Sequence, residues 1–442
     1  MLARSITLVH ATALVIGIII GASIFVQPSV ITGAVPTTTG VYAVWIVSGV
    51  LTLFGALIAA ELASAYPRAG GVYVFLREAF SPALGFLWGW AMLWTMHTGI
   101  IAAIATIFAR YASFFHPMGD SGVRLLAVAA VILLTAINYV GVRQGSLVQT
   151  TFTILKIAAI LAIIGAAFAL GARTVVTPVG APAAPPPLNA SRFPLAVVAG
   201  LFAFGGWHMV TYAAEETRDP ERTIPRALLV GVLVVTACYV ALNAAYYHVL
   251  SPARIAASDR VAADAADAML GRGGAELMSA IVAVSTFGAL NGVILSGPRA
   301  YLAMARDGLL LQWLAVTHSR YRTPHRAILL QGAWAVVLVS TGSYRGLFTR
   351  VVYTEWIFFA LMAIGLMRLR RSDDYAPAYR VWGYPLVPLV FIVSSLYIVI
   401  TQIVAEPVAS LTGLLFVAAG LPVYWLAVRK PSLPPRAPEH AD

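Results

Sequence analysis

The 442-residue chain is 60% hydrophobic and only 11% charged, with a mean hydropathy of +0.85. A soluble domain carries about 25% charged residues because its surface faces water. So few charges exclude a soluble globular class, and apolar runs of about 20 residues, the length that crosses a bilayer, recur along the chain. The formal net charge of +11 does not indicate a nucleic-acid partner here, because Lys and Arg gather in the cytoplasmic loops of membrane proteins. The composition predicts an all-α protein that spans a lipid bilayer several times.

The sequence offers little for enzyme or cofactor chemistry. The single cysteine, Cys238, lies in an apolar run and can form neither an intramolecular disulfide nor a metal cluster. No expected span contains a His-Glu-x-x-His metal motif, a Gly-x-Ser-x-Gly elbow or paired aspartates. We therefore expect no metal, no cofactor and no enzymatic activity. The first apolar run is too long for a cleavable signal peptide.

Twelve apolar runs predict twelve membrane helices. They are Leu8–Ile31, Val41–Tyr66, Leu84–Phe115, Arg124–Val140, Gln149–Leu170, Phe193–Ala214, Ala227–Leu250, Leu277–Met304, Ala327–Thr341, Val351–Met367, Leu386–Ala405 and Ala409–Val428.

The connections between these helices have distinct compositions. Residues 173–192, with the Pro/Ala-rich stretch Val175–Pro187, form an expected extracellular linker, and Ser251–Gly274 is expected as a water-facing loop. Arg306–Arg326 and Arg368–Arg380 are strongly basic, and the Pro-rich tail 429–442 is expected to be disordered.

Charge distribution predicts the topology. With an even number of spans both termini lie on one side, and placing them inside leaves about 19 of the 29 Lys and Arg there and about 9 outside. Basic residues favour the cytoplasm, so both termini and the tail are expected to be cytoplasmic. The alanine-rich, lysine-poor composition indicates a prokaryotic cell membrane.

Two expected helices contain glycine clusters that a plain membrane anchor would not need. The first runs from Gly17 to Phe25 with Gly21 at its centre, and the sixth from Phe202 to His208 with paired glycines. Small residues for close helix packing are the alternative. However, these helices open two successive groups of five, and interrupted segments in corresponding positions indicate an inverted-repeat transporter that binds its substrate at the breaks.

Several motifs, in order, resemble the L-type amino acid transporter-like branch of the amino acid–polyamine–organocation superfamily. The similarity extends from Gly17 to about Leu386. Its motifs are Gly21-Ala22-Ser23-Ile24-Phe25, Tyr66-Pro67-Arg68-Ala69-Gly70-Gly71-Val72-Tyr73, Phe202-Ala203-Phe204-Gly205-Gly206-Trp207, Ile224-Pro225-Arg226-Ala227, Phe287-Gly288-Ala289-Leu290-Asn291-Gly292 and Ala305-Arg306-Asp307-Gly308.

The resemblance implies a twelve-helix LeuT-type fold with a 5+5 inverted repeat. Residues 1–172 would form the first repeat, 193–368 the second, and 369–428 the two C-terminal helices. Carbonyls near Ile19, Phe202 and Gly205 would accept the substrate ammonium, and Gly21 and Ala203 are further expected substrate-binding residues. The amides of Ala22, Ser23 and Ile24 would bind the substrate carboxylate, because a helix N-terminus favours anions.

The resemblance also assigns coupling and gating roles. Lys156, in the middle of the fifth expected helix, would replace a sodium ion as the cation between the first and eighth helices, which predicts sodium-independent transport. A lysine at that depth is costly and usually has a partner. Phe202 would be an aromatic gate, Asn291 would hydrogen-bond the first break, and Glu355 is a candidate proton or gate residue.

Other residues leave alternatives open. Ser23 stands where the family more usually has glycine, so it could narrow the site or be a neutral packing change. Trp207 and His208 follow the second break, where His208 could contact the substrate side chain or be structural. His97 and His248 are weaker candidates. We expect Glu61, Glu215 and Glu216 to pair with loop arginines such as Arg68, Arg218 and Arg226, either as a cytoplasmic latch or as a static network.

The sequence therefore predicts a sodium-independent carrier of L-amino acids, working by alternating access as an exchanger or a proton-linked symporter. A neutral substrate is expected because no acidic residue is evident in the predicted pocket. The alternatives are a carrier of polyamines, basic amino acids or amines, which could use Glu355, and a receptor that binds without transport. In the resembled animal transporters a cysteine between the third and fourth helices links a heavy subunit. The corresponding loop, His116–Gly122, has none, so we expect no disulfide-linked heavy subunit and a monomer or weak homo-oligomer.

Overall fold

The computed structural model describes residues 4–171, 192–258, 260–271, 273–342 and 353–427. This part of the chain is helical, and its isolated β-bridge joins Ile6 to Thr217. The expected linker 173–192 lies outside it except for Arg192, as does the expected tail 429–442.

The helices follow the apolar runs closely. In the first half they are α1 (Leu8–Ile19), α2 (Ser23–Ala34), α3 (Thr38–Ala65), α4 (Val72–Ala79), α5 (Pro82–Ala91), the π-helical η1 (Met92–Met96), α6 (His97–Ala112), α7 (Asp120–Val140) and α8 (Val142–Leu170). In the second half they are α9 (Phe193–Ala203), the 3₁₀-helical η2 (Trp207–Glu216), α10 (Pro220–Val249), α11 (Pro252–Ala257), α12 (Val261–Leu270), α13 (Gly274–Ser296), α14 (Pro298–Arg306), η3 (Gln312–Ala315), α15 (His325–Thr341), α17 (Thr354–Leu369), α18 (Leu386–Ala405), α19 (Pro407–Ala418) and α20 (Gly420–Ala427).

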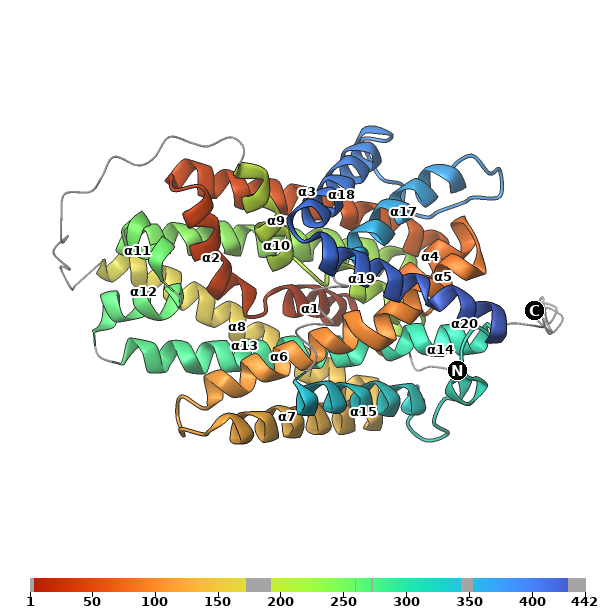
Figure 1. Ribbon diagram of the computed structural model, residues 1–442, viewed down its shortest axis with the longest axis horizontal. Coiled ribbons are helices and arrows are strands. Elements are labelled where there is room, and N and C mark those ends of the chain that lie inside the picture. The colour runs from red at the N-terminus through yellow and green to blue at the C-terminus, as the bar shows by residue number, and fades with distance from the viewer. Residues whose placement is uncertain (1–3, 172–191, 259, 272, 343–352, 428–442) are drawn as a thin grey trace.

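Nine spans within the described residues are long and apolar enough to cross a membrane, and α1 with α2, bent by 46°, makes a tenth if counted as one. Two further expected spans are shorter: α15 has 17 residues and α17 has 16. The chain is thus a helical membrane protein. Figure 1 shows α1 in the interior, where it packs against α8, α10, α13 and η2.

Both predicted helix breaks are present. Ile20, Gly21 and Ala22 separate α1 from α2, and residues 204–206 separate α9 from η2. Gly206 has a φ of +90°, a left-handed conformation that favours glycine, and a Cβ there would meet the side chain of Ile18. The second break therefore needs a glycine both for its backbone conformation and for its contact with α1.

Two predictions about local structure are wrong. α8 begins at Val142 rather than Gln149, because Gly145, Ser146 and Gln149 are buried polar or small residues of the helix and not an apolar run. The segment Ser251–Gly274 is not a plain water-facing loop: it forms α11, which buries Ile255, and α12, whose alanine-rich face is buried.

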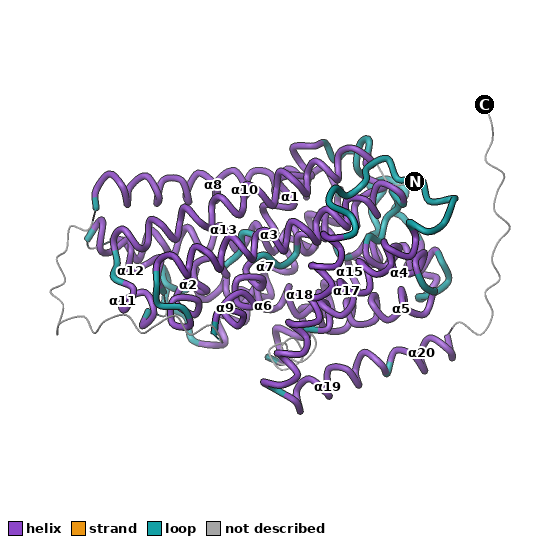
Figure 2. The backbone as a smooth tube through the Cα atoms, turned by 90° about the horizontal axis from the view of Figure 1, so that it is seen from above, coloured by secondary structure: helices purple, strands orange, loops and turns teal. Residues whose placement is uncertain are grey.

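Different helices form the two ends of the molecule. In Figure 1 α4 and α14 lie towards one end, α11 and α12 lie at the opposite end, and α1 lies between them. The C-terminal helices α19 and α20 lie along the outside, as Figure 2 shows, where Leu415 and Trp425 are 60% and 68% exposed. Exposed apolar side chains of this kind suit contact with lipid.

Candidate substrate site at two helix breaks

A cavity of about 210 Å³ lies between the two breaks. Its walls come from α1 and α2, α6, α9 and η2, α13 and α17. The lining residues are Ile18, Ile19, Gly21, Ala22, Ser23, Ile100, Ala103, Ile104, Ile107, Leu201, Phe202, Gly205, Gly206, Trp207, Met209, Val293, Glu355, Trp356 and Phe359. Apart from the backbone, Ser23 and Glu355, the wall is mainly apolar.

The first break offers backbone donors to this cavity. Ser23 is the first residue of α2, and Ala22 is its N-cap. The first amides of a helix have no acceptor within the helix, and the helix N-terminus carries partial positive charge. The cavity-lining Ala22 and Ser23 therefore offer the donors that a carboxylate needs, whereas Ile24 is fully buried away from the cavity.

The carbonyls at the breaks already have partners in this structure. The hydroxyl of Tyr239 on α10 lies 3.0 Å from the oxygen of Ile19 and 2.9 Å from that of Ala203, and it can donate to one of them at a time. Gly205 N donates to the oxygen of Phe202 at 3.2 Å. Tyr239 thus ties the ends of α1 and α9 together, a role missed from the sequence, where a tyrosine in an apolar run reads as packing.

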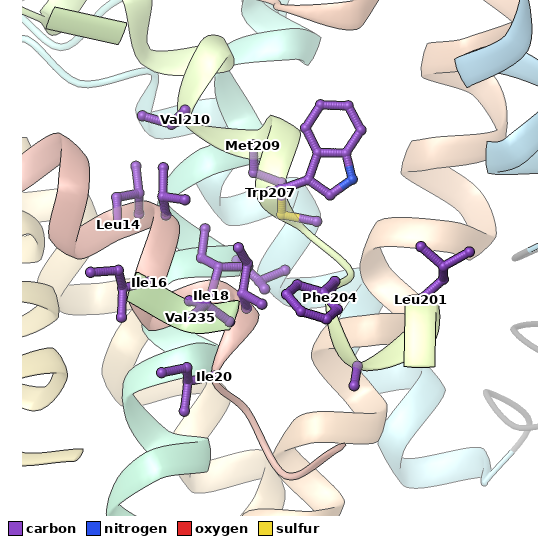
Figure 3. Close-up of a cluster of buried hydrophobic side chains, with 14 of the residues drawn as sticks. Leu14, Ile16, Ile18, Ile20, Leu201, Phe204, Trp207, Met209, Val210 and Val235 are labelled. Carbon is purple, nitrogen blue, oxygen red and sulfur yellow. The ribbon is translucent and has the colours of Figure 1, made fainter. Parts of the chain in front are cut away.

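Apolar side chains join the two breaks. Figure 3 shows Ile18 of α1 beside Phe204, Trp207 and Met209 of the second break. Of the predicted gate residues, Phe202 faces the cavity and is 37% exposed. The sequence reasoning also missed the wall on α6, although Ile100, Ala103, Ile104 and Ile107 have the spacing of one helix face.

Lys156 is buried against the first break and not in the cavity wall. Its ammonium donates to the oxygens of Gly17 at 2.8 Å, Ile20 at 2.7 Å and Ser285 at 2.9 Å. These carbonyls belong to α1, its C-cap and α13, so one cation joins three segments. Because an ammonium has three hydrogens, every one of them has an acceptor.

Asn291 does not reach the first break. Its amide donates to the oxygens of Gly145 and Gln149, at 3.0 and 3.2 Å, and its own oxygen accepts from Asn138. This prediction is wrong because α8 starts early enough for its polar first turns to lie against α13. Asn291 instead fixes α7, α8 and α13 to one another.

The histidines lie outside the cavity lining. His208 is 1% exposed and packs among the rings of Trp88, Tyr212 and Phe359. The Nε2 atom of His97 lies 2.8 Å from the oxygen of Val293. Within the described residues, no group of three His, Cys, Asp or Glu side chains could hold a metal ion.

A neutral substrate was predicted because no acidic residue was evident in the pocket. That premise is wrong, because the acidic residue Glu355 lines the cavity. It lies beside Trp356, with Trp207 and Phe359 in the same wall. Sequence distance conceals this proximity, since α17 follows η2 by more than 130 residues.

The predicted acidic latch residues form ion pairs, but with other arginines. Glu216 pairs with Arg299 at 2.7 Å, with both side chains fully buried, and Glu215 pairs with Arg306 at 2.9 Å. Glu61 accepts two hydrogen bonds from Arg370, which raise the pKa of this arginine.

Two of the arginines expected as partners contact other groups. Arg68 lies 3.9 Å from Glu78, and Arg218 donates to the backbone of Arg4. The pairing was mispredicted because the true partners come from distant helices and not from the neighbouring loop.

Comparisons with known proteins agree with this arrangement. Residues 6–428 match the amino acid permease family. The chain is 32% identical to the serine/threonine exchanger SteT of Bacillus subtilis over 96% of its own length and 97% of that protein. It is 31% identical to the mouse b(0,+)-type amino acid transporter 1, over 97% and 88%. It is 32% identical to the human large neutral amino acids transporter small subunit 2, over 97% and 81%. The chain therefore belongs to the amino acid permease family of the amino acid–polyamine–organocation superfamily.

Proposed function

We propose that this protein is a sodium-independent secondary transporter of L-amino acids with neutral side chains, working by alternating access as an exchanger or a proton-linked symporter. Its fold is a LeuT-type arrangement of twelve membrane helices with a 5+5 inverted repeat and two C-terminal helices, with both termini cytoplasmic. Cys238 is buried on α10, which agrees with a transporter that has no disulfide-linked second subunit.

The observation that carries this proposal is the cavity between the two helix breaks. An amino acid needs donors for its carboxylate and acceptors for its ammonium at a fixed separation. The N-terminus of α2 supplies donors, and the ends of α1 and α9 supply carbonyls, two of which lie within hydrogen-bond distance of the Tyr239 hydroxyl. The remaining wall is largely apolar and suits an uncharged side chain.

Lys156 supports independence from sodium. Its ammonium occupies the carbonyls of Gly17, Ile20 and Ser285, which are the hard oxygen ligands that a sodium ion would use. A permanently attached cation at that position makes a transported cation unnecessary for holding α1 to α13.

A second candidate is a carrier of basic amino acids, amines or polyamines. Glu355 favours it, because a carboxylate flanked by aromatic rings could attract a cation. Under this reading the substrate's side-chain ammonium would lie against Glu355.

The test is uptake of a panel of labelled L-amino acids and polyamines into proteoliposomes. Each compound is tested with and without internal amino acid, and with sodium replaced by choline. Uptake of neutral amino acids that persists in choline is the expected result. Dependence on sodium, or uptake of basic compounds alone, would refute the proposal. Binding without flux would assign the protein as a receptor.

A further inference from the structure

The carboxylate of Glu355 is isolated in an apolar wall. It is the second residue of α17 and is partly exposed, through the cavity that it lines. Within the described residues it has no hydrogen-bond or ion-pair partner, unlike Glu61, Glu215 and Glu216. A carboxylate in a mainly apolar wall and without a partner has little to stabilise its charge, and such a group tends to gain a proton or a cation.

Among the described residues, the helices packed against α17 supply no cation to Glu355. α18 carries no charged residue. On α3, Glu61 pairs with Arg370, 15 residues along the chain from Glu355 and so about 22 Å away at a helical rise of 1.5 Å. On α4, Arg77 pairs with Asp307 and Glu78. These charges all lie at the other end of α17.

The other titratable side chains near the cavity lie outside its lining. Tyr212 of η2 is buried within electrostatic range of both Glu355 and Tyr301. His208 of η2 and His97 of α6 lie behind the wall, buried among rings and against a backbone oxygen. Lys156 has all three of its hydrogens on carbonyls.

Buried polar groups without partners lie on η2 and α14, outside the cavity lining. The Nδ1 atom of His208 and the hydroxyl of Tyr301 are buried and have no hydrogen-bond partner in the described part of the chain. Tyr212 contacts His208 and accepts, through its backbone oxygen, from Gly70 N in the turn after α3. Tyr301 lies on α14, the helix that ends beside Asp307. Unpartnered buried polar groups are places where water molecules are held.

We infer that Glu355 is the proton-binding group of this transporter, taking up one proton from the cavity together with a neutral amino acid and releasing it to the cytoplasm past Tyr212 and Tyr301. The inference rests on the proposed function and chooses proton-linked symport over pure exchange. The O–H bond forms on one carboxylate oxygen with a proton from water in the cavity and breaks when the proton passes to cytoplasmic water. No charge is left unpaired in the wall when the neutral substrate is enclosed.

The experiment measures uptake and internal pH together in proteoliposomes that enclose a pH-sensitive dye. Neutral amino acid is added with the outside at pH 5.5 and the inside at pH 7.5, and again with no gradient. For one proton per substrate, a gradient of two pH units supports accumulation on the order of 100-fold, a factor of ten per unit. The wild type is expected to acidify the interior only when substrate is added, and to accumulate substrate only with the gradient.

The variants are Glu355→Gln, Glu355→Asp and the matched control Glu406→Gln. Glu406 is an exposed glutamate between α18 and α19, so its variant should match the wild type. In Glu355→Gln the uptake that remains should be equal with and without the gradient and cause no acidification. Glu355→Asp keeps a carboxylate and should retain coupling, which would separate proton binding from a merely structural role.

Three results would overturn the inference. The first is wild-type uptake without acidification, which would leave amino acid transport standing as exchange alone. The second is a Glu355→Gln variant whose accumulation still follows the gradient. The third is uptake of basic amino acids or polyamines only, lost in Glu355→Gln, which would place the substrate's own cation at Glu355 and refute the neutral substrate as well.

Discussion

Replacing Lys156 by methionine tests whether this one cation organises the first break. Methionine keeps an unbranched side chain of similar length but removes the three hydrogen bonds to Gly17, Ile20 and Ser285. The oxygen of Ile20 keeps the Ser285 hydroxyl at 3.2 Å, so the oxygens of Gly17 and Ser285 lose most. An unsatisfied buried polar group costs roughly 1–3 kcal/mol.

The fold is expected to survive this substitution, because removing a buried lysine also removes a desolvation cost of several kcal/mol. The lost hydrogen bonds are expected to disturb the geometry of the first helix break instead. If the transporting conformations lose about 1.4–2.8 kcal/mol of stabilisation, uptake should fall about 10- to 100-fold, at 1.4 kcal/mol per factor of ten. The assay is initial uptake in choline, with the melting temperature in detergent as the measure of folding.

The matched control is Thr150→Val on the same helix. Thr150 donates only to the oxygen of Ser146 in α8 itself, so its variant should transport as the wild type does. Wild-type uptake by Lys156→Met would refute the reasoning, since the three hydrogen bonds would then have no functional consequence. Sodium-dependent uptake by the wild type would also refute the reasoning, because the Lys156 ammonium would then not replace a sodium ion.

Further substitutions test the site and the ion pairs. Gly17→Ala should abolish uptake, because the added Cβ would overlap the side-chain amide of Gln149. The control Gly33→Ala, on the second helix of the same broken pair, has open space around it and should not abolish uptake. Equal activity of the two variants would contradict this prediction. Ser23→Gly should lower the KM for larger side chains relative to smaller ones, which competition with unlabelled amino acids measures, and an unchanged ranking would assign Ser23 to packing. Glu216→Gln leaves a buried arginine without its carboxylate and should cost about 3–5 kcal/mol, seen as a lower melting temperature in detergent; a stability equal to the wild type would show that the pair contributes little.

The sequence by itself determined the membrane class, the order of the helices and the positions of both breaks. These features are local: the length of an apolar run sets a span, and a glycine cluster within it marks where the helix is interrupted. The motifs also indicated the family to which the chain belongs. Lys156 could be singled out for the same reason, because a charge in the middle of an apolar run is costly wherever it points.

Only the tertiary structure decided which side chains meet. It placed Glu355 in the cavity wall, Asn291 against α7 and α8, and Tyr239 between the ends of α1 and α9. It also paired Glu216 with Arg299 across 83 residues of sequence. Such contacts depend on how helices pack and rotate against one another, and hydrophobic periodicity leaves that rotation undetermined for helices that are apolar on every face.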